Sequence, residues 1–143
     1  MSYLSKTLAA SFAAALLASS ASAETLRMGH DQPEAQGYQE VGRYLDKRLK
    51  EELGPDWQVN IFPGAQLGNE MAMLDSVIAG NLDMSIAATA NASTFVPELG
   101  IFSVSYVFED VDHFRRVMND EQFNAMFDEI VESKGLGIRR IAS

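Results

Sequence analysis

The first half of the chain alternates between strand-like and helix-like spacings of apolar side chains. Leu26 and Met28 alternate with polar neighbours, which predicts a short strand over residues 25–28. Apolar side chains then recur every three or four residues, which predicts an amphipathic helix that ends at Gly54-Pro55. The predicted buried face of this helix consists of Tyr38, Val41, Leu45 and Leu49.

The same order of strand, polar loop and helix repeats in the following residues. Residues 57–62 predict a second strand, which Pro63-Gly64 interrupts before a helix over residues 71–78. Residues 82–88 are apolar nearly throughout, as in a buried strand of a parallel sheet. Three strands joined by helices predict an α/β fold, with right-handed crossovers and helices on both faces of a parallel-rich sheet.

The second half of the chain is mainly helical in its pattern. Residues 89–100 are small, polar and turn-prone, which predicts a loop or a broken helix. Two amphipathic helices follow, the first with Asp110 as N-cap and the second with Asn119 or Asp120. Their apolar stripes consist of Val111, Phe114 and Met118 in the first, and Phe123, Met126, Phe127 and Ile130 in the second. After a glycine-rich turn, residues 138–142 predict a last strand.

The composition of the chain indicates a folded core and excludes several classes of partner and of chemistry. The chain has 143 residues, 47% of them hydrophobic, which is long and apolar enough for a folded core. Its formal net charge of -9 disfavours nucleic acid and anionic lipid surfaces as partners, because phosphate groups would repel it. The absence of cysteine excludes disulfides, thiolate metal sites and cysteine nucleophiles.

The first residues have the pattern of an export signal. Lys6 precedes an apolar run over residues 8–17, and Ala21-Ser22-Ala23 offers a small-X-small cleavage site. A membrane anchor is the alternative, but the run is about half of the roughly 20 residues that a spanning helix needs. We therefore expect residues 1–23 to be a cleaved signal peptide, a mature chain that begins at Glu24, and a periplasmic location without a membrane-embedded segment.

Few residues are suited to catalysis or metal binding. His30 and His113 are the only histidines, and no short spacing joins them, so a metal site would need distant carboxylates. The sequence has no phosphate-binding or nucleophile-elbow motif, although a serine, histidine and aspartate triad stays an alternative. We predict no catalytic residue, metal or cofactor.

Three polar loops follow the three predicted strands. They are residues 30–32, residues 66–70 and residues 88–91. Ligands of open parallel sheets bind outside the carboxyl ends of the strands, because loops and helix amino termini meet there. These loops are therefore the candidate ligand site.

The second loop and its helix carry a recurring motif. It consists of Phe62, Pro63, Gly64, Gln66, Leu67, Gly68 and Glu70, followed by Gly80, Leu82 and Asp83. The motif resembles that of the solute receptors of tripartite ATP-independent periplasmic (TRAP) transporters, of the dicarboxylate-receptor type. The resemblance implies a type II periplasmic-binding-protein-like fold with two lobes. It further implies that residues 24–143 are the amino-terminal lobe, truncated near the hinge strand.

The resemblance also implies ligand residues in each loop. His30 and Asp31 match the first ligand-contacting loop, Glu70 matches a polar contact at the start of the second helix, and Ala88 with Thr89 matches the third loop. Asn91 is a further candidate in that loop. Turn formation remains an alternative role for Asp31 and Asn91, and helix-dipole stabilisation one for Glu70.

A further ligand residue of the family falls outside this sequence. The arginine that pairs with the substrate carboxylate is expected beyond Ser143, since Arg139 and Arg140 do not match its position. We interpret these two arginines as solvated strand charges.

The function implied is that of a receptor without enzymatic activity. It would bind a small organic acid and deliver it to a TRAP-type membrane permease. A receptor for an ATP-driven importer is one alternative, and a secreted hydrolase or lyase is another.

Overall fold

The computed structural model describes residues 24–141, so the expected signal peptide and the last residue of the expected final strand lie outside the described residues. The elements in chain order are β1 (Glu24–Gly29), α2 (Gly37–Leu53), β2 (Trp57–Phe62), α3 (Glu70–Ile78), β3 (Met84–Ser85), α4 (Thr89–Ala92), the 3-10 helix η2 (Pro97–Ser103), α5 (Val111–Met118) and α6 (Glu121–Ser133). The expected order of strands and helices is confirmed up to residue 133.

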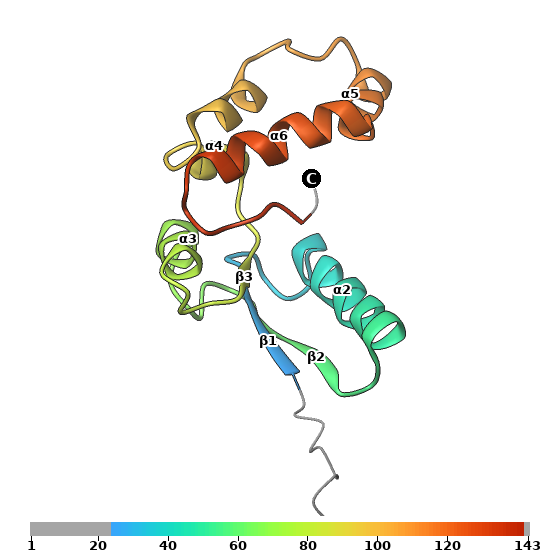
Figure 1. Ribbon diagram of the computed structural model, residues 1–143, viewed down its shortest axis with the longest axis vertical. Helices are drawn as coiled ribbons and strands as arrows, with labels where there is room; N and C mark the ends of the chain where they lie inside the picture. The colour runs from blue at the N-terminus through green and yellow to red at the C-terminus, as the bar shows by residue number, and fades with distance from the viewer. Residues whose placement is uncertain (1–23, 142–143) are drawn as a thin grey trace, which may run out of the picture.

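The sheet is parallel and has the order β2-β1-β3, as Figure 1 shows. β1 pairs with β2 along its whole length, from Glu24 opposite Trp57 to Gly29 opposite Phe62. β3 pairs only through Met84 and Ser85, so the prediction of a strand over residues 82–88 was too long. One reason is that the Asp83 carboxylate accepts the N–H of Arg27 at 2.8 Å, a donor that a longer β3 would have used.

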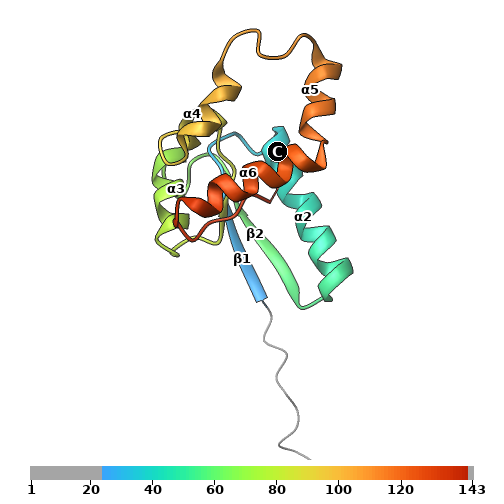
Figure 2. The same ribbon diagram turned by 45° about the horizontal axis from the view of Figure 1, so that its top comes forward.

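Helices α2 and α3 cover opposite faces of the sheet, as predicted (Figures 1 and 2). Consecutive strand residues face opposite ways, and the packing around β1 follows this rule. On one side a Cβ added at Gly42 of α2 would lie 2.7 Å from Ile61, with Met28 also in contact. On the other side a Cβ at Gly29 would lie 2.6 Å from the sulfur of Met73 in α3. Glycine at both positions therefore permits close packing of helix and strand.

The buried face of α2 differs from the predicted stripe. Gln39 and Gly42 are its buried residues, whereas Val41 is 49% exposed. Gly42 brings the helix backbone against the sheet, and this contact turns Val41 toward solvent while Leu45 and Leu49 stay half-buried. The hydrophobic pattern does not predict this contact of Gly42 with the sheet, because glycine carries no apolar side chain.

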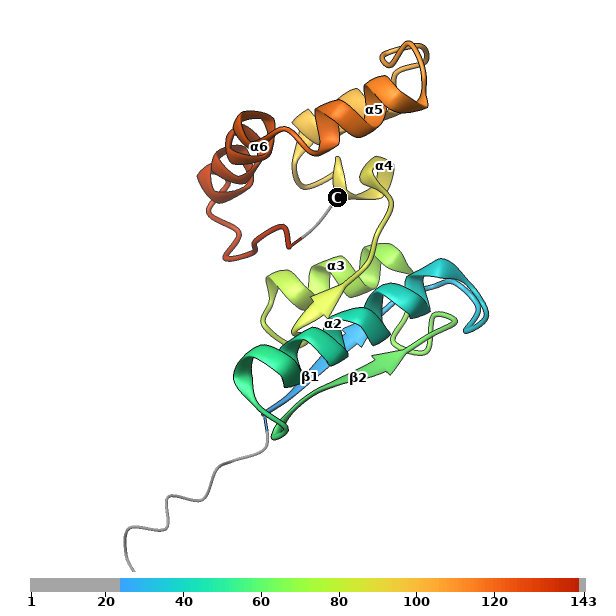
Figure 3. The same cartoon turned by 90° about the vertical axis from the view of Figure 1, so that its right-hand side faces the viewer.

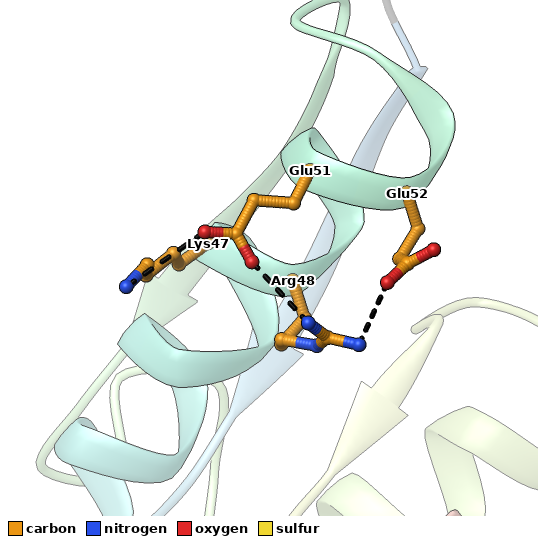
Figure 4. Close-up of polar contacts among 4 residues, drawn as sticks. All are labelled: Lys47, Arg48, Glu51 and Glu52. Atoms are coloured by element: carbon orange, nitrogen blue, oxygen red, sulfur yellow. Dashed lines mark hydrogen bonds and ion pairs between the residues drawn. The ribbon is translucent and has the colours of Figure 1, made fainter.

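The outer face of α2 is covered by ion pairs between neighbouring helical turns (Figure 4). Glu51 pairs with Lys47 at 3.7 Å and with Arg48 at 3.4 Å, and Arg48 also pairs with Glu52 at 2.7 Å. Exposed pairs of this kind each contribute only about 0.3–0.5 kcal/mol. They mark this face as solvated.

Residues 89–133 form the helical part of the chain. The predicted broken helix is confirmed as α4 followed by η2. Asp110 is the N-cap of α5 and accepts the N–H of His113 at 2.6 Å, and Asp120 is the N-cap of α6 and accepts the N–H of Phe123 at 2.8 Å. Phenylalanine rings join η2 to α6, with centroids 5.3 Å apart for Phe102 and Phe127.

The predicted strand over residues 138–142 is wrong for its described part, because residues 138–141 pair with no other strand. This segment runs back beneath α6 (Figures 1 and 3). The Arg140 guanidinium holds it there, donating to Asp128 at 3.1 Å and to the carbonyl oxygen of Asn124 at 3.2 Å. Arg139 pairs with Glu132 at 3.1 Å and its side chain is 83% exposed, so it is solvated as predicted, although not on a strand. The Arg140 side chain is only 19% exposed, so the prediction of a solvated charge is wrong for Arg140.

Within residues 24–141, no helix combines the length and the apolar character needed to cross a bilayer.

Candidate ligand-binding site

The strand order places the candidate loops at one edge of the sheet. β1 is central, its crossover runs to β2 on one face, and the crossover from β2 returns to β3 on the other. The carboxyl ends of β1 and β3 therefore form a topological switch point, where open α/β sheets bind ligands. The N–H of Ile86 donates to the carbonyl of Gly29 at 3.1 Å, which joins these two ends directly.

Glu70 is the centre of the contacts between loops. It is the first residue of α3, it is 7% exposed, and Asn69 caps its helix by accepting the N–H of Ala72 at 2.9 Å. The Glu70 Oε2 atom accepts the backbone N–H of Ala88 at 3.1 Å and also accepts the side-chain amide of Asn91. The structure thus brings together the predicted site residues Glu70, Ala88 and Asn91 (Figure 3 shows α4 beginning above α3).

No positive side chain neutralises the Glu70 carboxylate in the part of the chain that the structure describes. None of the ion pairs formed there includes Glu70. Its Oε1 atom has no donor from residues 24–141, since both recorded bonds go to Oε2. A nearly buried carboxylate held only by neutral donors keeps the capacity to accept further hydrogen bonds.

His30 is fully buried, at 0% exposure. Its Nε2 atom lies 3.0 Å from Oε1 of Gln39, and its ring meets Tyr38 edge-on at 6.0 Å. Its Nδ1 atom has no hydrogen-bond partner among residues 24–141. A ligand role for His30 stays a prediction, and these contacts give it a place in the packing between β1 and α2.

The other predicted residues are more accessible. Asp31 is half-buried and accepts the side-chain amide of Gln32 at 2.8 Å, while Thr89 is exposed at the start of α4. The backbone N–H of Ala65 donates to the carbonyl of His30 at 3.1 Å, which ties the first loop to the second. Ligand contact by Asp31 and Thr89 remains a prediction.

Two residues of this site were missed by sequence reasoning. Gln39 contacts the His30 ring through Oε1, and the hydrophobic pattern gave no signal for it, because Gln39 lies outside the predicted apolar stripe of α2. Asn69 caps α3, and its signal was an asparagine directly before an acidic residue at the start of a helix.

A shallow depression of about 430 Å³ lies elsewhere, between α5 and α6, and contains none of the predicted site residues. Its lining consists of His113, Arg116, Val117, Asp120 and Phe123.

Comparison with known proteins decides the family. The model of family 7 of the bacterial extracellular solute-binding proteins, DctP, matches residues 28–140. The chain belongs to this family. The resemblance that the Phe62 to Asp83 motif indicated is therefore confirmed, and so is the expected periplasmic-binding-protein-like α/β fold.

Relatives within the family include periplasmic proteins named for acid ligands. The 2,3-diketo-L-gulonate-binding periplasmic protein YiaO of Escherichia coli (strain K12) is 26% identical over 125 residues, which cover 87% of this chain and 38% of YiaO. The sialic acid-binding periplasmic protein SiaP of Vibrio cholerae serotype O1 is 27% identical over 110 residues, which cover 77% of this chain and 34% of SiaP.

A solved structure shows the same fold. The TRAP periplasmic solute binding protein from Polaromonas sp. JS666, bound to D-erythronate, matches with a TM-score of 0.72 and 25% identity, over 78% of this chain and 36% of that protein. The chain thus spans between 34% and 38% of the length of these three proteins.

Proposed function

We propose that residues 24–143 form the amino-terminal lobe of a two-lobed extracytoplasmic receptor, which binds a small organic acid and delivers it to a TRAP-type membrane permease. The observation that carries the proposal is the convergence of loops at the switch point, where Glu70 bonds Ala88 and Asn91 across two loops. Family membership supports a receptor role without enzymatic activity. No nucleic acid has a part in it, because the chain carries a net charge of -9.

The ligand class is proposed from chemistry that the relatives share. YiaO and SiaP are named for binding 2,3-diketo-L-gulonate and sialic acid, and the Polaromonas protein holds D-erythronate. Each of these ligands joins a carboxylate to hydroxyl groups. We assign His30, Asp31, Glu70, Ala88, Thr89 and Asn91 to this receptor's ligand-binding loops, with Glu70 accepting a hydrogen bond from a ligand hydroxyl, amine or bridging water.

The location is proposed from the leader. Cleavage after Ala23 would release a periplasmic chain that begins at Glu24. Intact mass spectrometry of periplasmic material is the direct test. A mature protein that keeps residues 1–23 would contradict the proposed cleavage.

Titration of the complete receptor with organic acids tests the function. We expect one reversible binding event for at least one acid, whereas an enzyme would give continuing heat. The Glu70→Ala variant should bind the same acid about 10 to 150-fold more weakly, because a hydrogen bond to a charged group contributes about 1.5–3 kcal/mol.

Asp75→Ala is the matched control for this variant, since Asp75 lies exposed on the same helix and carries the same charge. Its dissociation constant should stay within about twofold of wild type. If the Glu70→Ala receptor binds the acid as tightly as the Asp75→Ala receptor does, Glu70 makes no contact with the ligand and its role is structural.

A further inference from the structure

The two oxygens of the Glu70 carboxylate are in different situations. Oε2 accepts from the Ala88 N–H and from the Asn91 amide, which occupies both of its lone pairs. Oε1 receives no donor from the described residues, and the whole residue is 7% exposed. Asn91 and Ala88 therefore orient the carboxylate so that one acceptor oxygen is offered at the switch point.

An oxygen in this situation discriminates between chemical groups. It accepts a hydrogen bond from a hydroxyl or an ammonium group. A second carboxylate placed against it would be repelled, because both groups are negative, water is largely excluded, and no described lysine or arginine lies beside Glu70.

We infer that the receptor selects acids that carry a hydroxyl or ammonium group near Glu70 over plain dicarboxylates, and that Asn91 is a positioning residue for this selection. The inference rests on the proposed function. Asn91 acts through Glu70, since its amide already donates to Oε2 and fixes which oxygen faces the ligand.

The Glu70→Gln variant is the sharpest test of this arrangement. Two donors, from Ala88 and Asn91, converge on the Oε2 position, so the carbonyl oxygen of the new amide must take that place. The amide nitrogen then occupies the Oε1 position and donates. A charged acceptor toward the ligand becomes a neutral donor. The repulsion of a ligand carboxylate is thereby removed, while a ligand hydroxyl exchanges a charged partner for a weaker, neutral one.

The experiment compares D-erythronate with succinate, two acids of four carbons, and D-glucuronate with adipate, two acids of six, by calorimetry on the complete receptor. We expect wild type to bind at least one hydroxy acid roughly tenfold or more tightly than its matched dicarboxylate. Glu70→Gln should shift that ratio toward the dicarboxylate by about tenfold or more, with the melting temperature recorded to verify folding.

The positioning role of Asn91 has its own readout. Asn91→Ala frees the carboxylate to rotate and should reduce the ratio of the two affinities by roughly fivefold, which a change in folding stability alone would not do. Asn81→Ala, at an exposed asparagine outside the site, should leave the ratio unchanged.

Each failure has a separate meaning. A wild-type receptor that binds succinate as tightly as D-erythronate and adipate as tightly as D-glucuronate overturns the inference and leaves the proposed function standing. If Glu70→Gln leaves the ratio of the two affinities unchanged, the inference is also overturned and the proposed function still stands. A receptor that binds neither these four acids nor any other organic acid overturns the proposed function and the inference together.

Discussion

The sheet region, residues 24–88, and the helical region, residues 89–141, differ in how their amphipathic elements are covered. In the sheet region α2 and α3 each pack on one face of three parallel strands, and Met28, Met73 and Leu82 are buried between them. In the helical region the buried apolar residues are Val96, Phe127 and Val131. No described strand lies against α5 or α6, because the sheet ends at β3.

Exposed apolar side chains make the difference visible. Most of the large apolar side chains that are exposed among the described residues belong to the helical region, namely Ile101, Val104, Tyr106, Val111, Phe114, Met126 and Ile141. Tyr106 is 99% exposed and has a left-handed backbone, with φ of 62°. Local spacing and capping therefore mark where a helix begins and ends, whereas burial of its apolar face requires a surface that covers it.

Two methionines sharpen this comparison and give the largest expected effect. Met73 of α3 is 0% exposed, whereas Met126 of α6 is 45% exposed. Met73→Ala should lower the free energy of unfolding by about 2–5 kcal/mol, because it leaves a cavity beneath Gly29. Met126→Ala should cost less than about 0.5 kcal/mol. Urea denaturation of both variants measures the difference, and equal losses would contradict the contrast between the regions.

The glycine at the end of β1 provides a second test within the sheet region. Gly29→Ala puts a Cβ within 2.6 Å of the Met73 sulfur, with Leu67 and Leu82 at 3.5 Å. Since Met73 is fully buried and has little room to move, we expect a loss of about 1–3 kcal/mol. Gly37→Ala, at the open first position of α2, should be neutral or stabilising by up to about 1 kcal/mol. A Gly29→Ala protein as stable as wild type would show that this packing is loose.

Much of this contrast could be predicted from the sequence, but only for local features. Periodicity predicted the order of strands and helices, because period 2 and period 3.6 arise within a few residues. Asp110 was predicted as an N-cap for the same reason, since a cap bonds the backbone three residues on. Topology rules then placed three loops at one end of the sheet, which is where Glu70 meets Ala88 and Asn91.

Features that depend on distant contacts could not be predicted in the same way. The exposure of Val41 follows from the approach of Gly42 to Ile61, a strand residue 19 positions away. The bond between Glu70 and Asn91 joins residues 21 positions apart, and hydrophobic spacing does not specify which loop side chains meet. The strand over residues 138–142 failed because a strand needs a neighbour, and Arg140 binds α6 instead.

The capping aspartate of α5 tests how much the helical region depends on local hydrogen bonds. Asp110 accepts the N–H of His113 at 2.6 Å, and Asp110→Ala should lower stability by about 1 kcal/mol. Asp112→Ala is the control, since Asp112 forms an exposed pair with Arg115 at 3.4 Å. This substitution should lower stability by at most about 0.5 kcal/mol. Urea denaturation followed by circular dichroism measures the stability of both variants. If Asp110→Ala lowers stability no more than the control does, α5 depends on contacts other than its cap.

Asp46 of α2 gives the smallest expected effect, at the outer edge of the sheet region. Its Oδ1 atom accepts the N–H of Val59 at 2.8 Å, a donor on the free side of the edge strand β2. Its Oδ2 atom accepts from Lys50 at 2.7 Å. The hydrogen bond from Lys50, with that from Val59, lowers the pKa of Asp46 below the ordinary value of 3.8.

The sign of the pH dependence follows from this lowered pKa. The unfolded chain binds the proton more readily, so the contribution of Asp46 to stability is present above pH 3.8 and is lost as the pH falls through the lower folded pKa. Asp46→Asn keeps an acceptor for the Val59 N–H but removes the charge, so it should lower stability at neutral pH by only about 0.3–0.5 kcal/mol, with the difference from wild type vanishing in acid. High salt should shrink the same difference, since it screens the pair with Lys50 and spares the bond to Val59. Urea denaturation between about pH 7 and pH 2, with and without salt, measures both dependences, and a difference that grows in acid would contradict this account of Asp46.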